Sequence, residues 1–200
     1  MTTQTPALLI IDMQQAMALP QAGERNNPQA EANIARLLAA WRTGGHPVIH
    51  VRHMSRTPGS LFWPGQSGAE FQPAFQPLDS EMVFEKNVPD AFTHSALERW
   101  LHVRGIRRLL LVGVSTNNSV ESTARSAGNL GFDTLVVSDA CFAFARRDYH
   151  GMPRSADEVH AMALANLDGE YAQVLSTGQA LALLAADSPA AGRHGGEALP

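Results

Sequence analysis

The sequence predicts an α/β fold in three layers (α/β/α), with a six-stranded, mostly parallel sheet between two layers of helices. Short apolar runs alternate with helix-length amphipathic segments along the chain, which is the pattern of strand–helix–strand units. The 200 residues, 44% of them hydrophobic, are enough to build one large core. No linker or internal repeat divides the pattern, so we expect a single domain over residues 1–187 and a loose tail over 188–200.

Six apolar runs are predicted as strands. The first, Ala7 to Ile11, is apolar throughout, which suits a strand buried on both faces, and it ends at the acidic Asp12. The other five predicted strands are Pro47 to Val51, Met82 to Phe84, Arg107 to Gly113, Thr134 to Val137 and Ala172 to Leu175.

The segments between the strands are predicted as helices. In the first of them, apolar residues recur at helical spacing until Gly44 and Gly45 end it. Thr93 is expected as the N-cap of the second. The predicted helices are Pro28 to Thr43, Thr93 to Val103, Ser119 to Leu130, Ser155 to Leu167 and Gly178 to Ala186.

The segment from Arg52 to Ser80 differs from the other connections between predicted elements. It is rich in Pro, Gly, Ser and aromatic residues and is too long for a simple connector. We expect it to be irregular and to form a wall of a ligand pocket.

The net charge and the cysteine content argue against several classes of function. A formal net charge of -4 gives no general electrostatic reason to bind nucleic acid or an anionic membrane. A single cysteine, Cys141, rules out an intrachain disulfide and suits a reducing cytoplasm. The chain carries no GxGxxG or Walker A motif, so no nucleotide cofactor is expected.

Three polar residues of different chemistry follow neighbouring strands. Asp12 follows the first strand, Lys86 the third, and Ser119 lies after the turn that ends the fourth. Each has an ordinary explanation, as a helix cap or an exposed lysine. Because ligands of open α/β sheets bind beyond the carboxyl ends of the strands, we expect the three to meet at one rim. There they would supply a proton acceptor, a cation and a nucleophile at a helix N-terminus.

Four motifs in order make the sequence resemble the isochorismatase-like hydrolases, also called the cysteine hydrolase superfamily. They are LLIIDMQ, EKNVPDAF, LVGVSTNNSVESTARSAGNLGF and VVSDACFAF, and the resemblance spans about residues 5 to 177. It implies the strand order 3-2-1-4-5-6 and an Asp-Lys-Cys triad that hydrolyses an amide or related C–N bond.

The resemblance also implies roles for individual residues. Asp12 would be the general base and Lys86 its electrostatic partner. A cis peptide bond would join Val114 to Ser115, and the Ser115 and Ser119 amides would form the oxyanion site.

The sequence departs from this family at the nucleophile, where Ser119 replaces the cysteine. The serine is either a natural variant or an introduced exchange. A hydroxyl ionises several pK units above a thiol, so a serine enzyme is expected to be slow. Two alternatives stay open: a catalytically silent ligand-binding or assembly protein, and hydrolysis of a vinyl ether by Asp12 without a covalent nucleophile, as in some relatives.

The remaining predictions concern the surroundings of the triad. Cys141, in an apolar run, is expected to be buried and not to replace the nucleophile. No Asp-x-His accompanies His50 and His53, so we expect no metal, and both histidines are interpreted as strand-end residues that contact substrate. His160 is expected to be a hydrogen-bonded structural residue. The proposed substrate-binding residues are His53, Phe62, Trp63, Phe92 and Asn118.

The helix predicted from Ser155 to Leu167 carries more apolar residues than one buried face needs, Met162 and Leu164 among them. Burial against its own sheet would explain this as well. Since the related hydrolases are commonly oligomers, we expect a homo-oligomer, a dimer or tetramer, acting on a small molecule.

Overall fold

The computed structural model describes residues 4–187, and the tail predicted for 188–200 lies outside these residues. Its central sheet is parallel throughout and has the order β3-β2-β1-β4-β5-β8. The strands are β1 (Ala7–Ile11), β2 (Val48–His53), β3 (Met82–Lys86), β4 (Arg108–Val114), β5 (Asp133–Phe142) and β8 (Gln173–Leu175). The predicted fold class and strand order are confirmed, with β8 as the sixth strand of the sheet.

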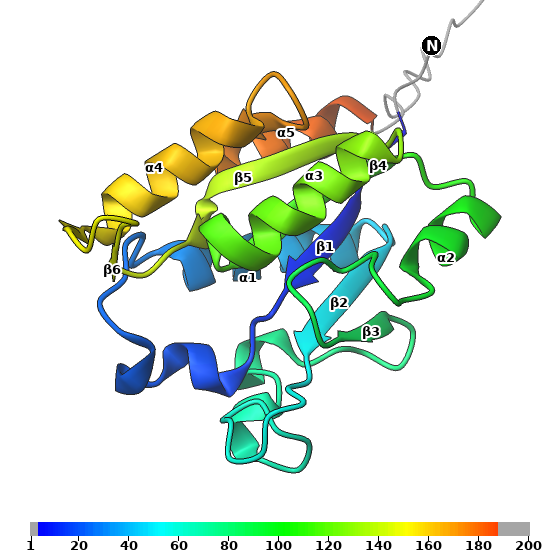
Figure 1. Ribbon diagram of the computed structural model, residues 1–200. Helices are drawn as coiled ribbons and strands as arrows, with labels where there is room; N and C mark the ends of the chain where they lie inside the picture. Colours follow the sequence, from blue (N-terminus) through cyan, green and yellow to red (C-terminus); the bar gives the residue numbers. More distant parts are fainter. Residues whose placement is uncertain (1–3, 188–200) are drawn as a thin grey trace, which may run out of the picture.

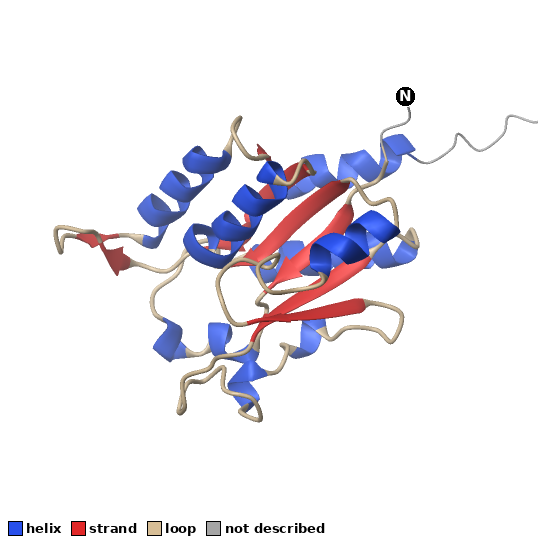
Figure 2. Cartoon of the chain, turned by 45° about the vertical axis from the view of Figure 1, so that its right-hand side comes forward, coloured by secondary structure: helices blue, strands red, loops and turns tan. Residues whose placement is uncertain are grey.

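Helices cover both faces of this sheet (Figures 1 and 2). On one face, α1 (Ala30–Thr43) and α5 (Thr177–Asp187) pack on the even-numbered residues of β1. On the other, α2 (Leu97–Val103), α3 (Glu121–Asn129) and α4 (Ala156–Leu167) pack on its odd-numbered residues. Every residue of β1 is fully buried, as its uninterrupted apolar sequence predicts.

Several strands run further than the sequence pattern indicates. The ladder between β2 and β3 continues through the pairs Arg52 with Glu85 and His53 with Lys86. These polar residues stay in the strands because the ladder between β2 and β3 persists at the carboxyl edge, beyond the last pair of β1 with β2. Lys86 therefore lies at the end of β3 rather than after it, and Cys141 lies within β5 rather than after it.

Every helix begins one to four residues from its predicted start, and two of these differences move a named residue. The second helix begins at Leu97, and Thr93 is not its N-cap: the Thr93 amide and hydroxyl donate to Asp90 Oδ2 at 3.1 and 2.5 Å instead. The third is preceded by a wider π-helical turn, η5 (Thr116–Val120), so Ser119 lies in that turn and not in the α-helix. An Asx-type hydrogen bond and a π turn leave no clear signal in hydrophobic periodicity.

The loop after β2 is more ordered than expected. It contains two short 3-10 turns, η3 (Ser67–Ala69) and η4 (Pro73–Phe75), and two more, η1 (Gln15–Ala18) and η2 (Pro20–Ala22), follow β1. Phe71 and Phe75 are buried in the core. An exposed hairpin of β6 (Arg146–Arg147) and β7 (Pro153–Arg154) extends from the sheet ahead of α4 (Figure 1). Over the described residues, the structure has no helix of the length and apolarity that a membrane crossing requires.

Candidate active site

Asp12 stands where β1 ends and the chain turns sharply. Its φ of 52° lies in the left-handed region, which aspartate tolerates better than most residues. The Asp12 amide donates to Val51 O at 2.9 Å, and its carbonyl accepts from the Gln14 amide at 2.7 Å. These bonds fix the backbone so that the carboxylate, only 1% exposed, is held inside the protein.

The turn that carries Ser119 depends on a close approach between β1 and β4. Gly113 adopts a φ of 122°, and a Cβ there would come 2.1 Å from Ile11 O. Only glycine fits this position. One residue further on, the peptide bond between Val114 and Ser115 is cis, at the place that the family resemblance implies. The Ser115 carbonyl then accepts from the Asn118 and Val120 amides at 3.0 and 3.2 Å, which closes the turn around Ser119.

Lys86 brings the three predicted catalytic residues together. Its Nζ donates to Asp12 Oδ2 at 2.7 Å and to Ser119 Oγ at 3.1 Å. Lys86 is 3% exposed and Ser119 5%, so both interactions lie in a water-poor environment where charges act strongly. The second carboxylate oxygen, Asp12 Oδ1, is buried and has no hydrogen-bond partner among the described residues. It is therefore available to accept a proton.

Two aromatic groups of the predicted site lie beside this cluster, from β2 and the loop that follows it. His53 ends β2 next to Lys86, and its ring meets that of Phe62 edge to face at a centroid distance of 5.8 Å. Burial and the Lys86 charge lower the pKa of His53, and the Asp12 charge only partly opposes them. Trp63 is half-buried in the same loop, and Asn118 is exposed in the turn next to Ser119.

Two predicted contact residues lie elsewhere. Phe92 stacks on Phe132, with ring centroids 5.7 Å apart, and Phe132 precedes β5 at the opposite edge of the sheet from Asp12. The role of Phe92 in substrate binding stays a prediction. His50 is buried in the middle of β2 and hydrogen-bonds to Glu81 at 2.9 Å, so its interpretation as a strand-end residue is wrong. The alternation of side chains along the strand sends His50 to the α1 face and His53 to the α3 face.

Cys141 is fully buried, as expected. Burial raises the pKa of its thiol to about 12, so it stays protonated at neutral pH and is a poor nucleophile. His160 is also hydrogen-bonded and buried, with Nδ1 2.8 Å from Thr116 Oγ1. Thr116 opens the turn that carries Ser119, so this contact supports that turn from the side of α4.

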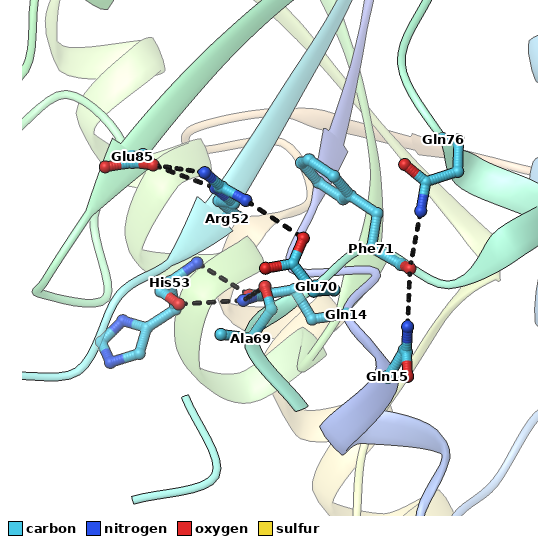
Figure 3. A network of polar contacts seen from close by, with 9 residues as sticks. All are labelled: Gln14, Gln15, Arg52, His53, Ala69, Glu70, Phe71, Gln76 and Glu85. Atoms are coloured by element: carbon cyan, nitrogen blue, oxygen red, sulfur yellow. Dashed lines mark hydrogen bonds and ion pairs between the residues drawn. The ribbon is translucent and has the colours of Figure 1, made fainter. Parts of the chain in front are cut away.

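Sequence reasoning missed another buried support of the site, the Gln14 side chain (Figure 3). Gln14 Oε1 accepts from the His53 amide at 2.8 Å, and Nε2 donates to the carbonyls of His53 at 2.9 Å and Ala69 at 2.8 Å. It is fully buried, although glutamine is mostly found on protein surfaces. The only sequence signal is its place two residues after Asp12, because its partners are 39 and 55 residues away.

In the part of the chain that the structure describes, no group of three or more His, Cys, Asp or Glu residues is placed to hold a metal ion. The residues around Lys86 suit acyl chemistry, because a shielded carboxylate and a hydroxyl both bind one ammonium group.

Comparison with known proteins agrees with this geometry. The model of the isochorismatase domain matches residues 6–179. The chain belongs to the isochorismatase family. Among solved structures, an isochorismatase-family protein from Chromobacterium violaceum is 50% identical, covers 93% of this chain and 96% of its own, and superposes with a TM-score of 0.90.

Two curated relatives illustrate the range of this family of hydrolases. The isochorismatase family protein YrdC of Bacillus subtilis is 39% identical over 173 residues, which are 86% of this chain and 92% of the relative. The ureidoacrylate amidohydrolase RutB of Acinetobacter baylyi is 28% identical over 180 residues, with 72% of this chain and 73% of the relative covered. This chain is accordingly a hydrolase of the isochorismatase family.

Proposed function

We propose that the protein hydrolyses a small amide or a related C–N bond, with Ser119 as nucleophile, Asp12 as general base and Lys86 as electrostatic partner. The observation that carries the proposal is the buried Lys86 ammonium, which donates to both Asp12 and Ser119. The amidohydrolase activity named for RutB supports the substrate class.

The reaction follows from the positions of the oxygens. Because Ser119 Oγ accepts a hydrogen bond from Lys86, its own proton must point to another acceptor, and Asp12 Oδ1 is unoccupied and buried nearby. Asp12 takes that proton as Oγ bonds to the carbonyl carbon. The C–N bond then breaks, and the nitrogen leaves with the proton from Asp12. A water molecule finally hydrolyses the ester and restores Ser119.

Lys86 makes this sequence possible for a hydroxyl. An alkoxide is far harder to form than a thiolate, and the adjacent ammonium stabilises the negative charge as it develops on Oγ. The amides of Ser115 and Ser119, both in the turn between β4 and α3, are the proposed donors to the oxyanion. His53, Phe62, Trp63 and Asn118 would contact the substrate from the loop and turn around the triad.

Four versions of the protein test the proposal against a panel of small amides, with release of ammonia or amine as the readout. The unchanged protein and S119C should be active, with S119C faster, because a thiolate forms more readily. S119A and D12N should lose activity by at least about 10²-fold. An S119A variant as active as the unchanged protein would overturn the covalent mechanism.

Two other functions are distinguished by the same variants. The unpaired Asp12 Oδ1 would also serve acid chemistry on a vinyl ether without a covalent intermediate. In that case D12N abolishes hydrolysis of a vinyl ether, and S119A does not. Activity that appears only in S119C would indicate a silent binding or assembly protein.

We also propose that two copies of this chain associate through the outer face of α4. Met162 is 65% exposed there, beside an open groove of about 870 Å³ between α4 and the β6–β7 hairpin. The groove presents both basic residues, such as Arg147, and acidic ones, such as Glu158, and charges of both signs would allow ion pairs with the same surface of a second copy. Light scattering across a tenfold dilution tests this: a mass of 21.5 kDa throughout would refute it.

The cytoplasmic location stays a prediction, which cell fractionation would test.

A further inference from the structure

His53 lies on the same face of the sheet as the triad lysine. The two are paired in register across β2 and β3, and paired residues of neighbouring strands project to the same side. Val51, two residues earlier in β2, packs in the same core as Phe84 of β3, two residues before Lys86. The imidazole is therefore at the carboxyl edge of the sheet, directly beside Lys86.

His53 is also the accessible member of this cluster. Asp12, Lys86 and Ser119 are each at most 5% exposed, whereas His53 is only half-buried. Neither of its ring nitrogens bonds to another described residue, and neither is among the fully buried polar atoms without a partner. A water molecule that approaches the triad from this side can hydrogen-bond to the imidazole.

The backbone of His53 is held more firmly than a strand end requires. Gln14 binds both its amide and its carbonyl, at 2.8 and 2.9 Å, and also the Ala69 carbonyl (Figure 3). Because Gln14 follows Asp12 by two residues, this clamp ties His53 to the segment that positions the general base. The edge-to-face contact with Phe62 restrains the ring itself.

We propose that His53 is the base that activates the hydrolytic water in the second half of the reaction, and that Gln14 is the positioning residue for it. The step rests on the proposed function, since it requires an acyl group on Ser119. The water oxygen bonds to the acyl carbon while a ring nitrogen takes its proton. The bond from carbon to Oγ then breaks, and Oγ recovers a proton from the imidazolium. One water is consumed, and both residues return to their starting forms.

The electrostatic surroundings suit a base. Lys86 and Asp12 face His53 from β3 and β1, and burial together with the Lys86 charge holds the pKa of His53 below its ordinary value of 6.5. The imidazole is therefore neutral at pH 7 and can accept a proton. Arg52 and Glu85 bind each other at 2.6 Å and, as the preceding residues of their strands, project to the other face.

The test uses p-nitrophenyl acetate, which acylates an active-site hydroxyl and releases a coloured leaving group. The full-length protein should give a burst equal to one nitrophenolate per active site, followed by slower turnover. H53Q should keep the burst and lose about 10²-fold in the later rate, with acetyl-Ser119 accumulating in the mass spectrum. Q14A should lower the same later rate by a smaller factor. H46Q, which alters a histidine at the other end of the same strand segment, should change neither phase.

Two further measurements separate a base from a structural residue. The turnover phase should fall with decreasing pH through the pKa of His53, and this inflection should vanish in H53Q. In H53A, added imidazole should restore turnover. An H53Q variant with unchanged turnover, or an H53A variant that imidazole does not rescue, would overturn the inference alone. A burst that persists in S119A would overturn the proposed function and this step with it.

Discussion

Glu81 is a carboxylate whose surroundings lower its pKa far below the ordinary value. It lies directly before β3, and its side chain is 6% exposed. Arg42 of α1 binds both carboxylate oxygens, at 2.7 and 2.8 Å, and Oε2 also accepts from the Leu78 amide at 2.9 Å and faces His50 Nε2 at 2.9 Å. This cluster fastens the end of the long loop to α1 and β2.

The magnitude follows from the carboxylate pKa. Burial opposes ionisation of Glu81, but the hydrogen bonds from Arg42, the Leu78 amide and His50 outweigh it and lower the pKa from 4.5 to about 2. This difference corresponds to about 3 kcal/mol in favour of the ionised form in the folded protein. A carboxylate with a lowered pKa contributes its full stability above pH 4.5 and loses it as the pH falls towards 2.

The perturbation is E81Q, which keeps the shape of the side chain and removes its charge. Urea unfolding at pH 7 should show a loss of about 3 kcal/mol in the free energy of unfolding. The difference from the unchanged protein should shrink at pH 4 and below. E85Q is the matched control: Glu85 also pairs with an arginine, but its side chain is 53% exposed, so its loss should stay below about 1 kcal/mol. Equal losses in E81Q and E85Q, or a loss in E81Q that does not depend on pH, would refute the reasoning.

Three further experiments probe the site and the core around it. K86M leaves the buried Asp12 carboxylate without its counter-charge, so urea unfolding should show a loss of about 3–5 kcal/mol, and amide hydrolysis should disappear. G113A places a Cβ 2.1 Å from Ile11 O, so thermal unfolding should show a loss of more than about 3 kcal/mol in the free energy of unfolding. G131A, with open space around its Cβ, should lose about 1 kcal/mol in the same measurement. Cys141, whose pKa burial raises to about 12, should not react with a disulfide reagent at pH 8 until urea unfolds the chain; rapid labelling of the folded protein would contradict this.

The fold and the triad could be predicted because both depend on local sequence. A strand buried on both faces must be apolar throughout, and β1 shows this directly in its five residues. Once the strands are parallel, their carboxyl ends share one edge, so polar residues at those ends must converge. Asp12, Lys86 and Ser119 meet for this reason, although 74 residues separate the first two.

The supports of the site could not be predicted, because they depend on contacts between distant segments. Nothing in the residues around Gln14 indicates that its amide binds a backbone 39 residues away, or that Glu81 binds an arginine 39 residues before it. His50 and His53 look equivalent in sequence. They are an odd number of residues apart in one strand, however, so their side chains project to opposite faces of the sheet. An error of one position in where a strand begins is therefore enough to exchange a core residue for a site residue.

The backbone fold sets the geometry around position 119, whereas the atom at this position, oxygen or sulfur, sets how readily it ionises. The left-handed Asp12, the close approach at Gly113 and the turn around Ser119 are all backbone features, and none depends on whether position 119 carries oxygen or sulfur. The Lys86 ammonium binds Ser119 Oγ at 3.1 Å, so a hydroxyl at this position makes the contact with Lys86. What changes is the free energy needed to ionise the nucleophile, about 1.4 kcal/mol for each pK unit. A neutral imidazole next to the triad matters more for such an enzyme than for one with a thiolate. Once the serine ester has formed, its release depends on how well water is activated.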